Sequence, residues 1–116
     1  MLKLEIHPLS NNALWKGRVY RSKRYNDYEE TMLWLIAAQN PKKYKGWVTV
    51  EYKFYLNKYY TNSDVFNYEK ALSDILEKAG VIEDDKYIKR GMVEKFLIPK
   101  GESEYIDIKI EKYEQT

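Results

Sequence analysis

The sequence contains no cysteine, one histidine and no long apolar run. The missing cysteines exclude disulfides, thiolate metal sites and a cysteine nucleophile, and they fit a reducing compartment. The longest apolar run, residues 32–38, is far shorter than a membrane span, and charged residues interrupt the N-terminus where a signal peptide would be apolar. We therefore expect a soluble intracellular protein with no membrane partner.

The single histidine, His7, lies at the end of the first expected strand. Neither a cysteine nor a second histidine stands nearby, so metal binding by imidazole is weakly supported. We expect His7 to have a structural role.

Apolar residues recur along the chain at the spacings typical of strands and helices. The length of 116 residues fits one domain. We see neither an internal repeat nor a low-complexity segment, and residues 8–24 have no sustained period. The last two expected strands are joined by a turn at residues 99–102 and are predicted to form a hairpin. In chain order, the patterns predict a strand over 2–6, a helix over 27–39, a strand over 48–56, a helix over about 64–79, and strands over 88–98 and 105–113.

Both expected helices carry boundary signals. Asn26 and Glu29 have the spacing of an N-cap and its capping partner, which places the start of the first helix at about residue 27. Ser63 or Asp64 can cap the second helix, and Gly80 suits a left-handed stop at its end.

Charge is distributed unevenly. Residues 1–24 hold six basic side chains against one acidic one, whereas residues 63–85 hold seven acidic side chains against two lysines. This asymmetry suits an enzyme acting on a polyanion, in which basic groups hold phosphates and carboxylates hold a cation. Alternatively, the two segments attract each other, within the chain or across a dimer.

Aromatic residues are interleaved with the basic ones in this N-terminal segment, at Trp15 and Tyr20. A nucleic-acid surface needs this combination, because cations contact phosphates and rings stack on exposed bases. Ordinary half-buried loops contain it as well.

Carboxylates flank the second expected helix, with Asp64 at its start and the pair Asp84-Asp85 beyond its end. They can meet in a metal site. Structural roles are the alternative: Asp64 as a helix cap, the acidic pair in a solvated loop, and Lys70 with Asp74 as an i, i+4 ion pair.

The order and spacing of these polar residues resemble the RusA family of Holliday-junction resolvases, common on phages and prophages. The family pattern is roughly D-x-D-N-x-x-K, then D-x-L, a glycine and a D-D pair. Further similarity lies in residues 8–12 and 17–20 and in Lys95. The matching positions in the pattern are Asp64, Asn67, Lys70, Asp74, Gly80, Asp84 and Asp85.

The resemblance implies an α/β (α+β) fold, with a mixed sheet of about four strands, two main helices and one RusA-like endonuclease domain over residues 1–116. It also implies a homodimer that cleaves four-way DNA junctions by paired symmetric nicks, in recombination and repair, in the cytoplasm of a bacterial or phage-infected cell. The implied cofactor is Mg²⁺, for which Mn²⁺ can substitute. Mg²⁺ prefers oxygen ligands, which agrees with the carboxylates of the pattern.

By position, the resemblance implies that Asp64 and Asp85 ligate magnesium and that Asp84 is an ancillary acid. It implies a phosphate or transition-state contact for Lys70 and an orienting role for Asn67. The expected DNA-binding residues are Lys16, Arg18, Arg21, Lys23, Arg24 and Lys95.

The chain departs from the pattern at Phe66, which stands where the family has its second aspartate and cannot bind a metal. Either the site uses fewer carboxylates, with Asp84 or Glu69 substituting, or the protein binds branched DNA without cutting it. A third interpretation is an interaction protein whose charged patches bind another protein.

Overall fold

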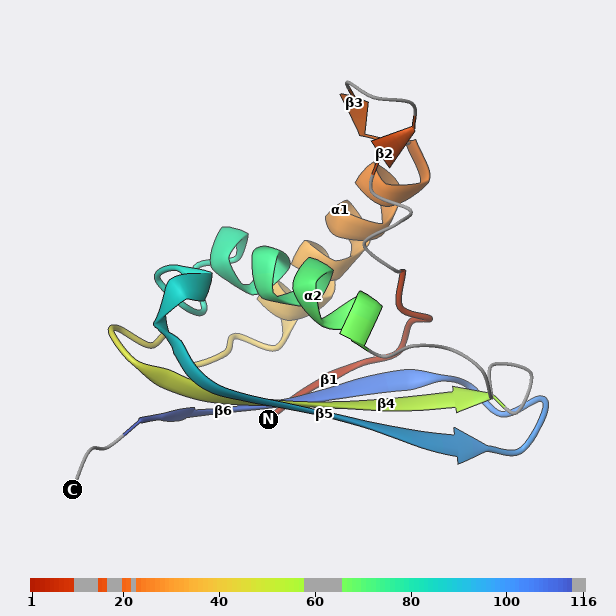
Figure 1. Ribbon diagram of the computed structural model, residues 1–116. Coiled ribbons are helices and arrows are strands. Elements are labelled where there is room, and N and C mark those ends of the chain that lie inside the picture. The colour runs from red at the N-terminus through yellow and green to blue at the C-terminus, as the bar shows by residue number, and fades with distance from the viewer. Residues whose placement is uncertain (10–14, 17–19, 22, 58–65, 114–116) are drawn as a thin grey trace.

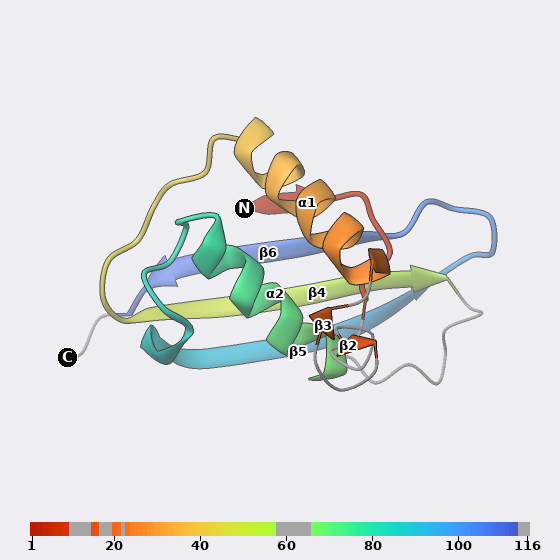
Figure 2. The ribbon, with the colours of Figure 1, turned by 90° about the horizontal axis from the view of Figure 1, so that it is seen from above.

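Two helices pack on one face of a four-stranded mixed sheet in the computed structural model (Figures 1 and 2). The structure describes residues 1–9, 15–16, 20–21, 23–57 and 66–113, with the backbone alone at 15–16, 20–21 and 66–67. The predicted α+β class, with a mixed sheet and two main helices, is confirmed. The elements are β1 (Leu2–Leu4), β2 (Trp15–Lys16), β3 (Tyr20–Arg21), α1 (Lys23–Ala38), β4 (Val48–Asn57), α2 (Phe66–Lys78), the 3-10 helix η3 (Asp85–Tyr87), β5 (Ile88–Ile98) and β6 (Tyr105–Lys112).

Strand β4 is central, in the sheet order β1-β6-β4-β5. Its predicted alternation is confirmed, because every second side chain from residue 48 to 56 is at most 1% exposed and lies on the face that the helices cover. Strand β5 runs parallel to β4 and β6 antiparallel to it. Helix α2 makes the crossover that a parallel pair requires.

The predicted hairpin of the last two strands is wrong, because β4 lies between β5 and β6. The connecting loop passes over the end of β4. There, Asn57 donates its side-chain amide to the Pro99 carbonyl at 3.5 Å and its backbone N–H to the Glu104 carboxylate at 2.7 Å. Two strands that flank a third lie about 10 Å apart. The loop from β5 to β6 spans this distance.

Helix α1 begins at Lys23, one turn before the predicted start, so Asn26 lies inside it and is exposed rather than capping it. The buried positions Tyr25, Tyr28, Met32 and Ile36 explain the difference, since they extend the apolar face back by one turn. Packing of two tyrosines thus outweighs a local capping signal.

Helix α2 ends as its sequence predicts, with Gly80 in the left-handed region at φ 76°. The Gly80 N–H bonds the Glu77 carbonyl at 3.0 Å, and the Val81 N–H bonds the Leu76 carbonyl at 3.0 Å. This is the Schellman arrangement, with buried Val81 and Leu76 as its apolar pair. The cap fixes the direction in which the chain leaves the helix into residues 81–85, which we call the acidic loop. Helix α2 begins at Phe66, and its expected caps, Ser63 and Asp64, lie outside the described residues.

The remaining differences concern short elements. The first strand ends at Leu4 rather than at residue 6, because a tight turn from the Ile6 N–H to the Leu4 carbonyl at 2.9 Å takes the chain out of the sheet. The antiparallel pair β2–β3 was not predicted, since two-residue strands are too short to show a period. No helix in the described residues is long and apolar enough to span a membrane.

Candidate active site

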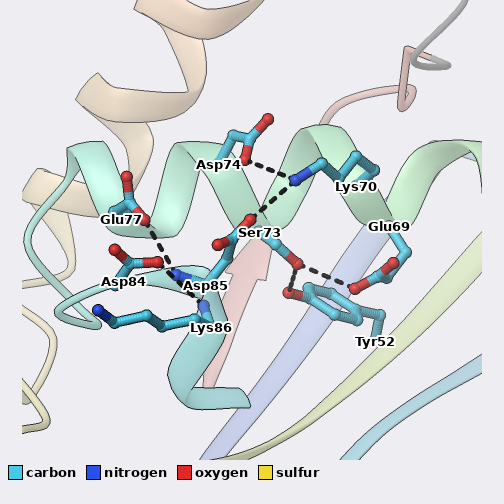
Figure 3. Close-up of polar contacts among 9 residues, drawn as sticks. All are labelled: Tyr52, Glu69, Lys70, Ser73, Asp74, Glu77, Asp84, Asp85 and Lys86. Atoms are coloured by element: carbon cyan, nitrogen blue, oxygen red, sulfur yellow. Dashed lines mark hydrogen bonds and ion pairs between the residues drawn. The ribbon is translucent and has the colours of Figure 1, made fainter. Parts of the chain in front are cut away.

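Helix α2 buries one side and presents a polar side to the loop that follows it. Ala71, Leu72, Ile75 and Leu76 are completely buried, as their i, i+1, i+4 and i+5 spacing requires for one face of a helix. Figure 3 shows Lys70, Asp74 and Glu77 on another side of the helix, where Lys70 and Glu77 contact Asp85 and Asp74 contacts Lys70.

One carboxylate of α2 and one of the loop itself hold the acidic loop in place. The Asp85 N–H donates to Glu77 Oε1 at 2.9 Å, which joins the loop to the last turn of the helix. Asp84 caps η3 by accepting the Lys86 N–H at 3.0 Å. These backbone contacts hold the Asp85 side chain over the polar side of α2.

Lys70 brings the two halves of the predicted site together. Its Nζ donates to Asp85 Oδ2 at 2.8 Å and to Asp74 Oδ1 at 3.4 Å (Figure 3). The hydrogen bond from Lys70 lowers the pKa of the Asp85 carboxyl, and the same bond raises the pKa of the Lys70 ammonium. The side chain of Lys70 is 56% exposed and that of Asp85 is 32% exposed, so both are accessible to a DNA phosphate.

At the same place, Asp85 also belongs to a cluster of three carboxylates. One oxygen from each of Glu77, Asp84 and Asp85 lies within 4.8 Å of the others. Oxygen donors from several carboxylates are the ligands that magnesium and calcium prefer, so the chemistry of this group fits a divalent cation.

Glu77 was missed by the sequence analysis. Its spacing of seven residues from Lys70 places both side chains on one side of the helix, a signal that could have found it. Exposed glutamates are common on helices, however, and the contact with Asp85 depends on the path of the loop.

A buried chain of hydroxyls lies beneath the site and was likewise not predicted. Tyr52 Oη and Ser73 Oγ are 2.7 Å apart, and Ser73 Oγ donates to Glu69 Oε1 at 3.0 Å. Because Ser73 has one hydroxyl proton and gives it to the carboxylate, Tyr52 must donate to Ser73. Burial raises the pKa of Tyr52, so the phenol keeps the proton that this chain requires.

Two residues of the predicted catalytic and metal-binding set are not described as side chains. Asp64 lies outside the described residues, and Asn67 lies in the first turn of α2 with its backbone alone described. In the described part of the chain, the structure therefore joins Lys70, Asp84 and Asp85 of the predicted set.

Lys95 lies on the side of the sheet that carries the site. It is opposite Phe54 in the β4–β5 register, and the Phe54 ring contacts Tyr68 of α2 with ring centroids 5.4 Å apart. Residues paired in register point to the same face, so Lys95 lies on the helix-covered face, level with the first turn of α2.

The basic N-terminal arm, residues 8–24, is described in part. Lys23 and Arg24 are exposed in the first turn of α1, where Lys23 pairs with Asp27 at 3.3 Å. The side chains of Lys16 and Arg21 and all of Arg18 lie outside the described residues. Figures 1 and 2 place β2, β3 and the start of α1 at the end of the helical layer where α2 begins.

His7 joins structural elements away from this acidic site. Its Nδ1 lies 2.8 Å from Glu104 Oε1, and the other oxygen of Glu104 accepts the Asn57 N–H. His7 therefore connects the N-terminal segment to the ends of β4 and β6.

A family model for the endodeoxyribonuclease RusA matches residues 7–111, which include every residue of the site. The chain belongs to the RusA endodeoxyribonuclease family. No curated protein matches the chain as a relative. Membership in the RusA family supports a nuclease of the Holliday-junction resolvase type that uses a divalent metal and acts on branched DNA.

Proposed function

We propose that this RusA-family protein is a magnesium-dependent, structure-selective endonuclease that resolves four-way DNA junctions. The contact between Lys70 and Asp85 supports this proposal most strongly, because it brings the lysine of the family pattern to the acidic pair that ends the pattern, on one accessible surface. We further propose that the protein works as a homodimer in the cytoplasm of a bacterial or phage-infected cell.

Asp85 and Asp84, together with Asp64, would hold the cation. The group formed by Glu77, Asp84 and Asp85 offers oxygen donors close enough to share one ion, and Mn²⁺ can occupy such a site in place of Mg²⁺. When bound, a divalent cation polarises a phosphoryl oxygen and lowers the pKa of an attacking water.

The remaining side chains would position the DNA. Lys70 has three donors, and the exposed ion pairs that engage it are weak. It can therefore turn one N–H to a phosphate oxygen while it stays beside Asp85. Asn67, in the first turn of the same helix, would orient the reacting groups, and Lys95 would contact phosphate from β5.

A second candidate function is binding of branched DNA without cleavage. The observation that favours it is Phe66, which removes one carboxylate from the family pattern. Cleavage then depends on whether another acid of this chain replaces it.

Gel analysis of a labelled four-way junction and a matching linear duplex tests the two functions. The wild type and Asp85→Asn are each incubated with EDTA, Mg²⁺ or Mn²⁺, and Asp107→Asn serves as the control because Asp107 lies on β6 facing away from α2. We expect symmetric nicks in the junction that require metal, lost in Asp85→Asn and retained in Asp107→Asn. Asp85→Asn should still bind the junction, since it removes a negative charge near the phosphates.

Binding without cleavage under all three conditions would favour the second function. Unchanged metal-dependent nicking by Asp85→Asn would show that the site is assigned wrongly.

A further inference from the structure

A second basic region lies on the far side of the acidic site from the N-terminal arm. Two segments form it: residues 42–47, which lead into β4, and residues 83–89, which contain η3. Figures 1 and 2 show both segments together at the end of the sheet where β4 and β5 begin. We call it the lysine–aromatic surface, and its members are Lys42, Lys43, Lys45, Trp47, Lys86, Tyr87 and Lys89.

Hydrogen bonds and a ring contact fix the two segments to each other. The Tyr44 N–H donates to the Val81 carbonyl at 2.8 Å, and the Gly46 N–H donates to Glu83 Oε1 at 2.6 Å. The rings of Trp47 and Tyr87 meet edge to face with centroids 5.4 Å apart. The lysines of the two segments therefore belong to one built surface.

The surface combines exposed lysines with one exposed ring, Trp47, and one half-buried ring, Tyr87. Lys89 Nζ lies 5.0 Å from the Trp47 ring centroid, and Lys86 Nζ lies 5.3 Å from that of Tyr87. Trp47 remains 48% exposed. Within the described residues, none of the five lysines forms an ion pair with a carboxylate. Glu83, one of the acids in these segments, accepts the Gly46 N–H.

The surface borders the carboxylates of the candidate site. Lys86 directly follows Asp85, and its backbone N–H is the one that Asp84 accepts. The surface therefore adjoins the place where the proposed function puts the phosphate that is cut.

We propose that the lysine–aromatic surface binds the sugar–phosphate backbone of one duplex arm of the DNA substrate, next to the phosphate that is cut. This rests on the proposed nuclease function. Lysines act on phosphates as point charges and carry no sequence information, so the surface sets position and orientation. The rings of Trp47 and Tyr87 add contact with sugars or with a base exposed at the branch point.

The decisive variant is Lys86→Gln/Lys89→Gln, which removes two exposed charges. The matched control is Lys53→Gln/Lys109→Gln, which removes two charges from the face of the sheet opposite the helices. Affinity for a four-way junction is measured in EDTA by fluorescence anisotropy over a range of salt concentrations. Binding is thereby separated from cutting.

We expect Lys86→Gln/Lys89→Gln to bind about 10- to 100-fold more weakly at 0.1 M salt, with a salt slope smaller by about 2, since each phosphate contact contributes about 0.9. The control should keep the wild-type slope. Circular dichroism and sedimentation check that the variants keep their fold and their state of association.

The outcomes separate this inference from the nuclease function. Weaker binding by Lys86→Gln/Lys89→Gln supports the surface even if the wild type does not cut. Wild-type affinity and slope in that variant overturn the inference even if the wild type cuts. A changed state of association with unchanged DNA affinity also overturns it, because the surface would then contact another protein chain.

Discussion

The single residues of the acidic site are held by contacts of very different strength. The Lys70–Asp85 pair is exposed, and such pairs contribute less than about 1 kcal/mol to stability. The Tyr52–Ser73 pair is buried, so loss of one partner leaves a polar group without a hydrogen bond at a cost of about 1–3 kcal/mol. The exposed pair can therefore rearrange when DNA arrives, while the buried pair keeps Glu69 in place.

We propose Glu69 as a replacement for the carboxylate missing at position 66. The two positions are one turn apart in α2, where side chains at i and i+3 are neighbours, and Ser73 holds the Glu69 carboxylate at 3.0 Å. We predict that Glu69→Gln slows junction cleavage about 10- to 100-fold, the usual cost of disturbing the groups around a metal. Phe66→Asp should restore the rate in the Glu69→Gln background. Single-turnover cleavage assays measure both.

The matched control is Glu30→Gln, an exposed acid of α1 outside the site. Metal affinity of each variant, followed by calorimetry with Mn²⁺ in the absence of DNA, gives a second measurement. If Glu69→Gln cuts and binds metal like the wild type, the site uses fewer carboxylates and Glu69 has no part in it.

Among the elements, the end of α2 determines where the acidic loop begins. Gly80 adopts φ 76° there, whereas Gly91 in β5 has no positive φ and a Cβ at its position would meet Ile88 Cγ2 at an ordinary 3.7 Å. We predict that Gly80→Ala destabilises the protein by about 1–2 kcal/mol, the cost of a left-handed residue with a side chain. Gly91→Ala should be neutral or stabilising by up to about 1 kcal/mol. Thermal unfolding compares them, and a similar loss of stability in both variants would contradict this account of the cap.

The sequence predicted elements well where the signal is local. The strand period of β4, the helix period of α2 and the Gly80 stop are all read from neighbouring residues, and each is confirmed. The position of β4 between β5 and β6 was not predictable in this way, because it depends on the long-range pairing of β4 with both strands. The start of α1 was predicted wrongly, since burial of Tyr25 outweighed the capping signal of Asn26.

The contacts of the site likewise divide into those that the sequence predicted and those that it did not. The approach of Lys70 to Asp85 was expected from the order of the family pattern. The contact of Glu77 with the Asp85 N–H and the chain from Tyr52 to Glu69 were not expected, because they depend on how the loop and β4 pack against α2. The lysine–aromatic surface joins segments about 40 residues apart in sequence, so no local pattern could reveal it.

In the whole molecule, basic regions lie at both ends of the acidic site. The N-terminal arm lies where α2 begins, and the lysine–aromatic surface lies where it ends (Figures 1 and 2). The described part of one chain presents one such site. Paired nicks on opposing strands of a junction therefore require two chains, and a two-fold axis of a dimer matches the near two-fold symmetry of the junction.

We predict that the protein is a dimer at micromolar concentration and that both nicks require both subunits. Sedimentation velocity gives the mass. In equal mixtures of wild type and Asp85→Asn after subunit exchange, about one quarter of the dimers carry two intact sites, as random pairing in a symmetric dimer requires. Products with paired nicks should fall to about a quarter of the wild-type level, while junctions nicked on one strand accumulate. A monomeric mass, or paired nicks that fall by half in proportion to the wild-type chains, would show that each chain acts alone.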